Sequence, residues 1–194
     1  MRLHLLIPMA ALFVAGSLRA QSLEQTLKYV RESIDAHAVT HRIEPPTRIS
    51  SVKWQVSKIE GCAVELKETD HRESADSVVN HNGVFSLDED RVITWSFDLG
   101  DLLPQFVMAD TSTGTPHIKV FAEGDAFHTK TETTSRLMRK DGSVESTQTW
   151  SSARTQRNLQ LNFDSPAIDN KALVHRLELD LRDAVYACSF HASR

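Results

Sequence analysis

The chain lacks the sequence motifs by which catalytic sites are usually recognised, although serine, histidine and acidic residues are plentiful. Of its 194 residues only two are cysteine and seven are glycine, and the glycines are scattered. There is no glycine-rich phosphate loop and no Gly-x-Ser-x-Gly nucleophile elbow. Lysine and arginine together number 22 against 26 acidic residues, giving a net charge of −4 without a basic run. This balance argues against nucleic acid or anionic lipid as the natural partner.

Long apolar runs are also missing, apart from one at the N-terminus. Leu5 to Val14 is mostly apolar, follows a positively charged start and precedes a run of small residues that ends at Ala20. The run is too short to span a membrane, and the pattern is typical of a secretory signal peptide. We predict residues 1–20 to be that peptide, with residues 21–194 forming a single secreted or periplasmic domain without a membrane span. A short uncleaved N-terminal anchor is the alternative.

The two cysteines both lie after the predicted cleavage site. In an exported protein an even pair more often forms a bridge than two reactive thiols, so we predict a disulfide between Cys62 and Cys188. Two separate buried thiols are the alternative.

Helical periodicity occurs at both ends of the chain. The segment 23–38 has apolar residues at three- and four-residue spacing behind Ser22, which is placed as an N-cap with Gln25 completing a capping box. A second, longer helix is predicted over 165–188, with Ser165 as cap and Pro166 at the first helical position. Its apolar stripe consists of Leu173, Leu177, Leu181, Val185 and Cys188.

Between the helices, apolar residues alternate with polar ones, as half-buried strands require. The clearest strands are 52–56, 62–66, 93–99 and 159–163. We expect 69–83 to be a loop or weak strand, 88–90 an acidic turn and 102–108 a loop. A polar hairpin, 127–136 with 144–151 across 140–143, is predicted to be solvated or to lie at a sheet edge because neither face is apolar.

These elements together indicate an α+β fold. Sequential strands with short connections favour one antiparallel meander sheet of six to eight strands, with both terminal helices packed on its apolar face.

Metal and cofactor signals are weak. His37 and His41 have the i, i+4 spacing of zinc proteases, but Ala38 stands where those enzymes carry a glutamate. A third ligand would have to come from the polar segment 69–83, which offers His71, Glu73, Asp76 and His81. We therefore predict no cofactor and no metal, with solvated histidines as the simplest interpretation.

Two groups remain as candidates for ligand binding. Trp150 follows a polar strand and could stack on a glycan or on a partner protein. Leu102, Phe106 and Met108 belong to an apolar cluster that covers one end of the sheet or lines a pocket mouth.

The sequence favours a non-catalytic binding or accessory module, with an unknown protein or glycan as partner, and we assign no catalytic residue. The first alternative is a carrier that holds an apolar small molecule between the sheet and the C-terminal helix. The second is a hydrolase with a dispersed site. The sequence does not indicate an oligomeric state.

Overall fold

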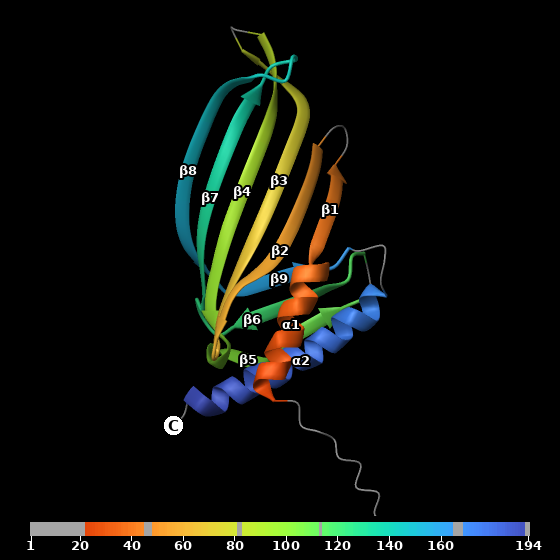
Figure 1. The fold of residues 1–194 in the computed structure, drawn as a ribbon, viewed down its shortest axis with the longest axis vertical. Helices are drawn as coiled ribbons and strands as arrows, with labels where there is room; N and C mark the ends of the chain where they lie inside the picture. Colours follow the sequence, from red (N-terminus) through yellow and green to blue (C-terminus); the bar gives the residue numbers. More distant parts are fainter. Residues whose placement is uncertain (1–21, 45–47, 81–82, 113, 165–168, 193–194) are drawn as a thin grey trace, which may run out of the picture.

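The computed structural model describes residues 22–44, 48–80, 83–112, 114–164 and 169–192 (Figure 1). Its helices and strands, in chain order, are α1 (Leu23–His37), β1 (Val39–Glu44), β2 (Arg48–Glu60), β3 (Ala63–Asn80), β4 (Gly83–Asp98), a 3₁₀ turn η1 (Leu99–Asp101), β5 (Leu102–Asp110), β6 (His117–Ala122), β7 (Phe127–Met138), β8 (Val144–Gln156), β9 (Asn158–Asn162) and α2 (Asn170–Ala192).

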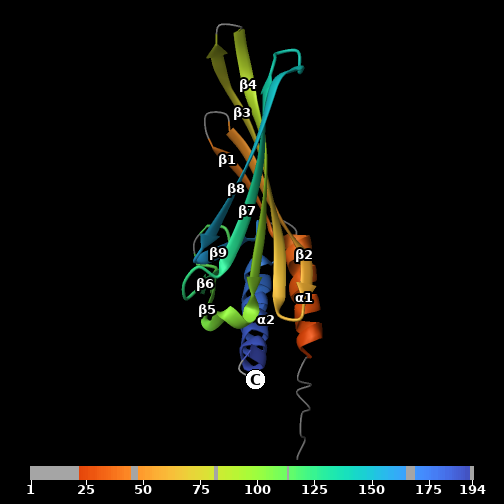
Figure 2. The same ribbon diagram turned by 90° about the vertical axis from the view of Figure 1, so that its left-hand side faces the viewer.

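The predicted α+β class is confirmed, but the strands form two antiparallel sheets instead of one. The large sheet has the order β1-β2-β3-β4-β7-β8, and the small sheet has the order β5-β6-β9. In Figure 1 the large sheet fans upward, and the small sheet and both helices lie at its lower end. The part of the large sheet above them is not covered by another element in either view (Figures 1 and 2).

The second sheet exists because 102–108 is a strand rather than the predicted loop. Leu102 and Val107 are both buried, although they are five positions apart, a step that puts two residues of a regular strand on opposite faces. A register shift between them in the pairing with β6 explains how both can face the core. Because of this irregularity, β5 does not show the regular alternation of apolar and polar residues by which a strand is recognised in a sequence.

The N-terminal helix begins as predicted and ends at His37, one residue before the predicted end. The Ser22 hydroxyl accepts from the Gln25 backbone N–H, and the Gln25 side chain accepts from the Ser22 N–H, so the capping box is complete. Leu27, Val30 and Ile34 are buried in the core shared with the sheets.

The C-terminal helix begins at Asn170, later than predicted. The Asp169 carboxylate accepts from the backbone N–H groups of Lys171 and Ala172 and therefore acts as the cap. The predicted cap Ser165 and Pro166 lie outside the described residues.

The apolar stripe of α2 is buried, with Leu173 at its margin and Val174 and Ala184 inside it. The stripe packs on β5, α1 and η1, so the small sheet, and not the large one, supplies most of the strand surface under this helix.

The predicted disulfide is confirmed between Cys62 and Cys188, whose Cα atoms are 5.7 Å apart. It joins the turn between β2 and β3 to the C-terminal part of α2, and Gly61 in that turn adopts a φ of 58°, which glycine accommodates without strain. The bridge therefore connects the large sheet to the helix that covers the small one.

Two polar segments, predicted as a loop or weak strand and as a turn, are part of long strands. Residues 69–80 continue β3, and 88–90 lie within β4 instead of forming a turn. The turn predicted at 88–90 was wrong, whereas for 69–80 the strand alternative is the one found. Both segments carry charged residues where a half-buried strand would show apolar ones, so the alternation is not visible in the sequence. The polar hairpin, by contrast, is confirmed as β7 and β8, with β8 at the sheet edge.

Candidate functional site

The large sheet has two faces, which we name by their contacts. The inner face carries Val56, Leu66 and Trp95 into the core, and the outer face lies opposite. Directly opposed residues of antiparallel strands point to the same side, so the strand register assigns every other residue to one face. Both faces carry charged residues where the core ends.

On the inner face two buried acidic residues of β3, Glu68 and Asp70, lie next to the apolar core. Trp95 donates its indole N–H to Glu68 over 3.0 Å, and burial raises the pKa of the Glu68 carboxyl above its ordinary value. Asp70 is only 1% exposed and accepts from Arg72 and from Arg91 at 2.7 and 2.5 Å. These contacts compensate the buried charge of Asp70, as a buried ion requires.

Several buried polar atoms on this part of the inner face make no hydrogen bond within the described structure. Among the described residues, buried atoms without a hydrogen-bond partner include Thr40 Oγ1, Trp54 Nε1, Asp70 Oδ1 and Arg91 Nε. The register places Thr40, Val52, Asp70 and Arg91 in one line across four strands. Buried polar groups normally find a partner, so this line is suited to a polar ligand or ordered water.

The same line continues to the predicted ligand residue Trp150. Arg91 is opposite Thr133 on β7, and Thr133 is opposite Trp150 on β8. Thr133 is buried, whereas Trp150 is 48% exposed on the inner face. The sequence marked Trp150 as unusual but could not show that it shares a face with buried charges.

The other predicted ligand residues lie elsewhere. Leu102 is 1% exposed and belongs to the core, while Phe106 and Met108 are 37% and 42% exposed on β5 of the small sheet. The structure therefore does not bring this cluster together with Trp150, which is on the large sheet.

The space between the sheets and the helices is filled. The apolar cavity there, lined by residues such as Leu27, Leu66 and Leu181, has a volume of about 30 Å³. Small-molecule sites are commonly about 300–1,000 Å³, so this cavity is too small for the ligand of the carrier alternative.

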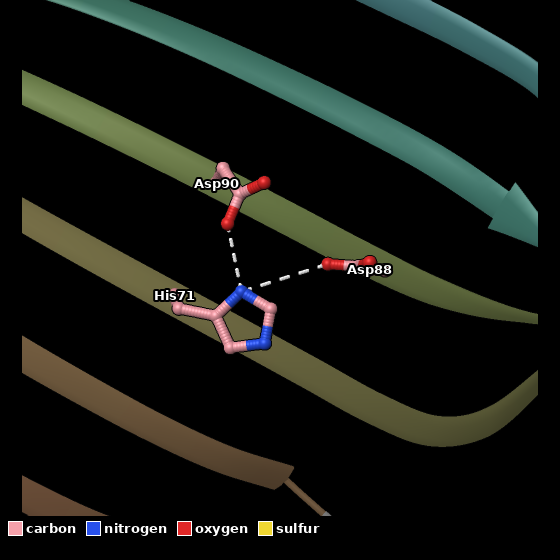
Figure 3. A group of neighbouring side chains, drawn as sticks. All are labelled: His71, Asp88 and Asp90. Carbon is pink, nitrogen blue, oxygen red and sulfur yellow. Dashed lines mark hydrogen bonds and ion pairs between the residues drawn. The ribbon is translucent and has the colours of Figure 1, made fainter.

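The outer face carries a different cluster, formed by His71 of β3 and two aspartates of β4 (Figure 3). His71 Nδ1 lies 2.7 Å from Asp90 Oδ1 and 3.7 Å from Asp88 Oδ1, and its Nε2 lies 3.1 Å from Glu73 Oε1. Arg136 of β7 approaches Asp90 Oδ2 to 2.6 Å and Asp88 Oδ2 to 3.6 Å.

Ion pairing shifts the pKa values of His71 and Asp90 in this outer cluster. Hydrogen bonds to Asp90 and then to Glu73 raise the pKa of His71, because both carboxylates favour the imidazolium. The hydrogen bond from Arg136, followed by that from His71, lowers the pKa of Asp90.

The histidine pair that the sequence suggested is not placed on one helix. α1 ends at His37, and His41 is exposed on β1. His71 and Glu73, considered only as further ligands of that pair, lie instead beside Asp88 and Asp90. The i, i+2 spacing of the two aspartates puts both on one strand face, a signal that becomes visible only once 88–90 is assigned to a strand.

Comparison of the chain with protein-family models, with curated proteins and with solved structures finds no match. In the part of the chain that the structure describes, no helix is both long and apolar enough to cross a membrane.

Proposed function

We propose that this protein is an exported, non-catalytic binding module that recognises an extended segment of another protein at the edge strand β8. The observation that carries the proposal is a 13-residue strand at the edge of the large sheet that is exposed along nearly its whole length.

Among the described residues β8 is paired only with β7. In an edge strand every second residue directs its N–H and C=O away from the sheet, where another extended chain can pair with them. Natural proteins usually block such an edge with lysine, proline or a very short strand. β8 contains neither residue type, and Glu145 and Arg154 are its only charged residues.

Trp150 supplies an anchor for the side chains of an added strand. It lies near the middle of β8 and is half-exposed on the inner face, next to Thr133. Backbone pairing gives affinity in strand addition, and contacts with alternate side chains give specificity. Tryptophan is also among the residues most often found at the energetic centre of protein interfaces.

Export is supported by two independent features. The sequence before residue 21 has the organisation of a signal peptide, although those residues lie outside the described structure. The disulfide is compatible with an oxidising compartment such as the periplasm or the extracellular space.

The proposal is tested by selecting 12-residue peptides from a random display library on the disulfide-bonded protein. Synthetic versions of the selected peptides are then titrated with N-methyl groups placed at each backbone nitrogen in turn. In strand addition only alternate peptide N–H groups pair with β8, so methylation at every second position should abolish binding and methylation in between should not. Trp150→Ala should weaken binding at least tenfold, whereas Leu179→Ala, at an exposed residue of α2, should leave it unchanged.

Hydrogen exchange of the complex should show new protection in β8. Selected peptides that protect another region, or methylation effects without alternation, would contradict the proposal. A failure to select any binder would also count against it. Light scattering could instead show a dimer in which β8 is protected from hydrogen exchange. In that case a second copy of the chain pairs with β8, and the proposed partner is overturned.

A further inference from the structure

The outer-face cluster has the donor atoms of a metal site. His71 and Asp90 are opposed in the register of β3 and β4, and Asp88 lies two residues from Asp90 on the same face. One nitrogen of His71 and one carboxylate oxygen from each aspartate all lie within 4.8 Å of one another. They come from the interiors of two adjacent long strands, which hold them more rigidly than loops would.

The surrounding residues orient these donors in the way that metal ligands are usually oriented. Both aspartates turn Oδ1 toward His71 Nδ1 and Oδ2 toward Arg136 (Figure 3 shows the three donors). Glu73 Oε1 lies 3.1 Å from the other ring nitrogen of His71. A carboxylate at the second nitrogen fixes the tautomer and makes the first nitrogen a better ligand.

One atom of the cluster is in ion-pair contact with His71 but forms no hydrogen bond in the described structure. Asp88 Oδ1 is buried and has no hydrogen-bond partner among the described residues. A buried carboxylate oxygen normally accepts at least one hydrogen bond or binds an ion. The 3.7 Å between this atom and His71 Nδ1 leaves space for an ion between them.

We propose that His71 Nδ1, Asp88 and Asp90 bind a divalent ion of the zinc class, with solvent completing its coordination. Calcium and magnesium prefer oxygen donors alone, whereas zinc accepts imidazole together with carboxylates. Zinc–ligand distances of about 2.0–2.2 Å place tetrahedral ligand atoms roughly 3.4 Å apart. The Nδ1–Oδ1 distance to Asp88 is close to this value, and the 2.7 Å contact with Asp90 has to lengthen on binding.

A plain ion-pair network is the competing explanation, because an imidazolium would also hold both aspartates. The two explanations differ in what they require of His71 Nδ1. A metal replaces its proton, whereas the ion-pair network keeps it, so direct measurement of metal binding separates them.

The test is a calorimetric titration of the full exported protein, purified without a histidine tag, with zinc chloride at pH 7.5. We expect one ion per chain with a dissociation constant of micromolar order or tighter. His71→Ala and Asp88→Asn should each weaken binding at least a hundredfold, and Glu73→Gln about tenfold, because outer-shell partners typically contribute factors of about 10–100.

Three histidine controls locate the site. His41→Ala, His128→Ala and His175→Ala alter exposed histidines outside the cluster and should bind zinc like the wild type. His71→Asn is a second variant of similar shape, and circular dichroism confirms that each variant is folded.

Binding weaker than millimolar would overturn the proposal, as would binding that survives both His71 variants. Loss of binding in a control histidine variant with full binding in His71→Ala would place the metal elsewhere and would also overturn it.

Discussion

Removal of the disulfide should cost this protein a large part of its stability. Cys62 and Cys188 are 126 residues apart, so the bridge closes a loop that spans most of the described chain. In the chain-entropy treatment, a loop of this length restricts the unfolded state by about 5 kcal/mol at 25 °C. Natural domains commonly have a total stability of about 5–15 kcal/mol, so Cys62→Ala/Cys188→Ala should be close to the limit of folding.

The measurement is equilibrium unfolding in urea, followed by tryptophan fluorescence, because Trp54 and Trp95 are buried and become solvated on unfolding. With a urea dependence of about 2 kcal/mol per M, a loss of about 5 kcal/mol should lower the midpoint by roughly 2.5 M. The urea dependence itself should increase, since the unfolded chain expands without the bridge. A loss below about 1 kcal/mol with an unchanged urea dependence would refute the loop-closure reasoning.

Further substitutions test the core and the buried acid. Leu177→Ala should lower the free energy of unfolding by about 2–5 kcal/mol, because Leu177 is fully buried. Leu179→Ala, at a residue 45% exposed on the same helix, should lower it by less than about 1 kcal/mol. Equal losses in urea unfolding would contradict the packing described for α2. Burial raises the pKa of Glu68, so the folded state binds more protons than the unfolded state, and stability should fall as pH rises from about 4 through the folded-state pKa. Thermal melts over a pH series should therefore show Glu68→Gln more stable than the wild type at pH 7 and equal to it below about pH 4; a less stable variant at pH 7 would contradict this. The Asp35 carboxylate accepts a hydrogen bond from the Val56 N–H over 2.6 Å and so joins α1 to β2. Asp35→Ala should therefore lower the free energy of unfolding by about 1–3 kcal/mol and speed hydrogen exchange of the Val56 amide. Unchanged exchange would show that this hydrogen bond contributes little.

The sequence predicted best where burial follows a local period. The capping box at Ser22, the stripe of α2 and the alternation through Trp95 were all visible, because each depends on neighbours three, four or two residues away. The Cys62–Cys188 bridge could also be predicted, since the chain has no other cysteine.

The prediction from sequence failed where a buried residue is charged rather than apolar. Asp70 is almost fully buried although it is charged, because Arg72 and Arg91 from its own and the neighbouring strand compensate its charge. Such compensation depends on strand pairing, so the sequence did not decide between a loop and a weak strand for this part of β3.

The sequence by itself determined the α+β class, the start of α1 and the partner of each cysteine, because these follow from periodicity, capping chemistry and pairing by elimination. Only the tertiary structure decided that the strands divide into two sheets, that β8 is left at an edge beside Trp150, and that His71 faces Asp88 and Asp90. These features depend on the register between strands, and register is set by contacts among residues far apart in the chain.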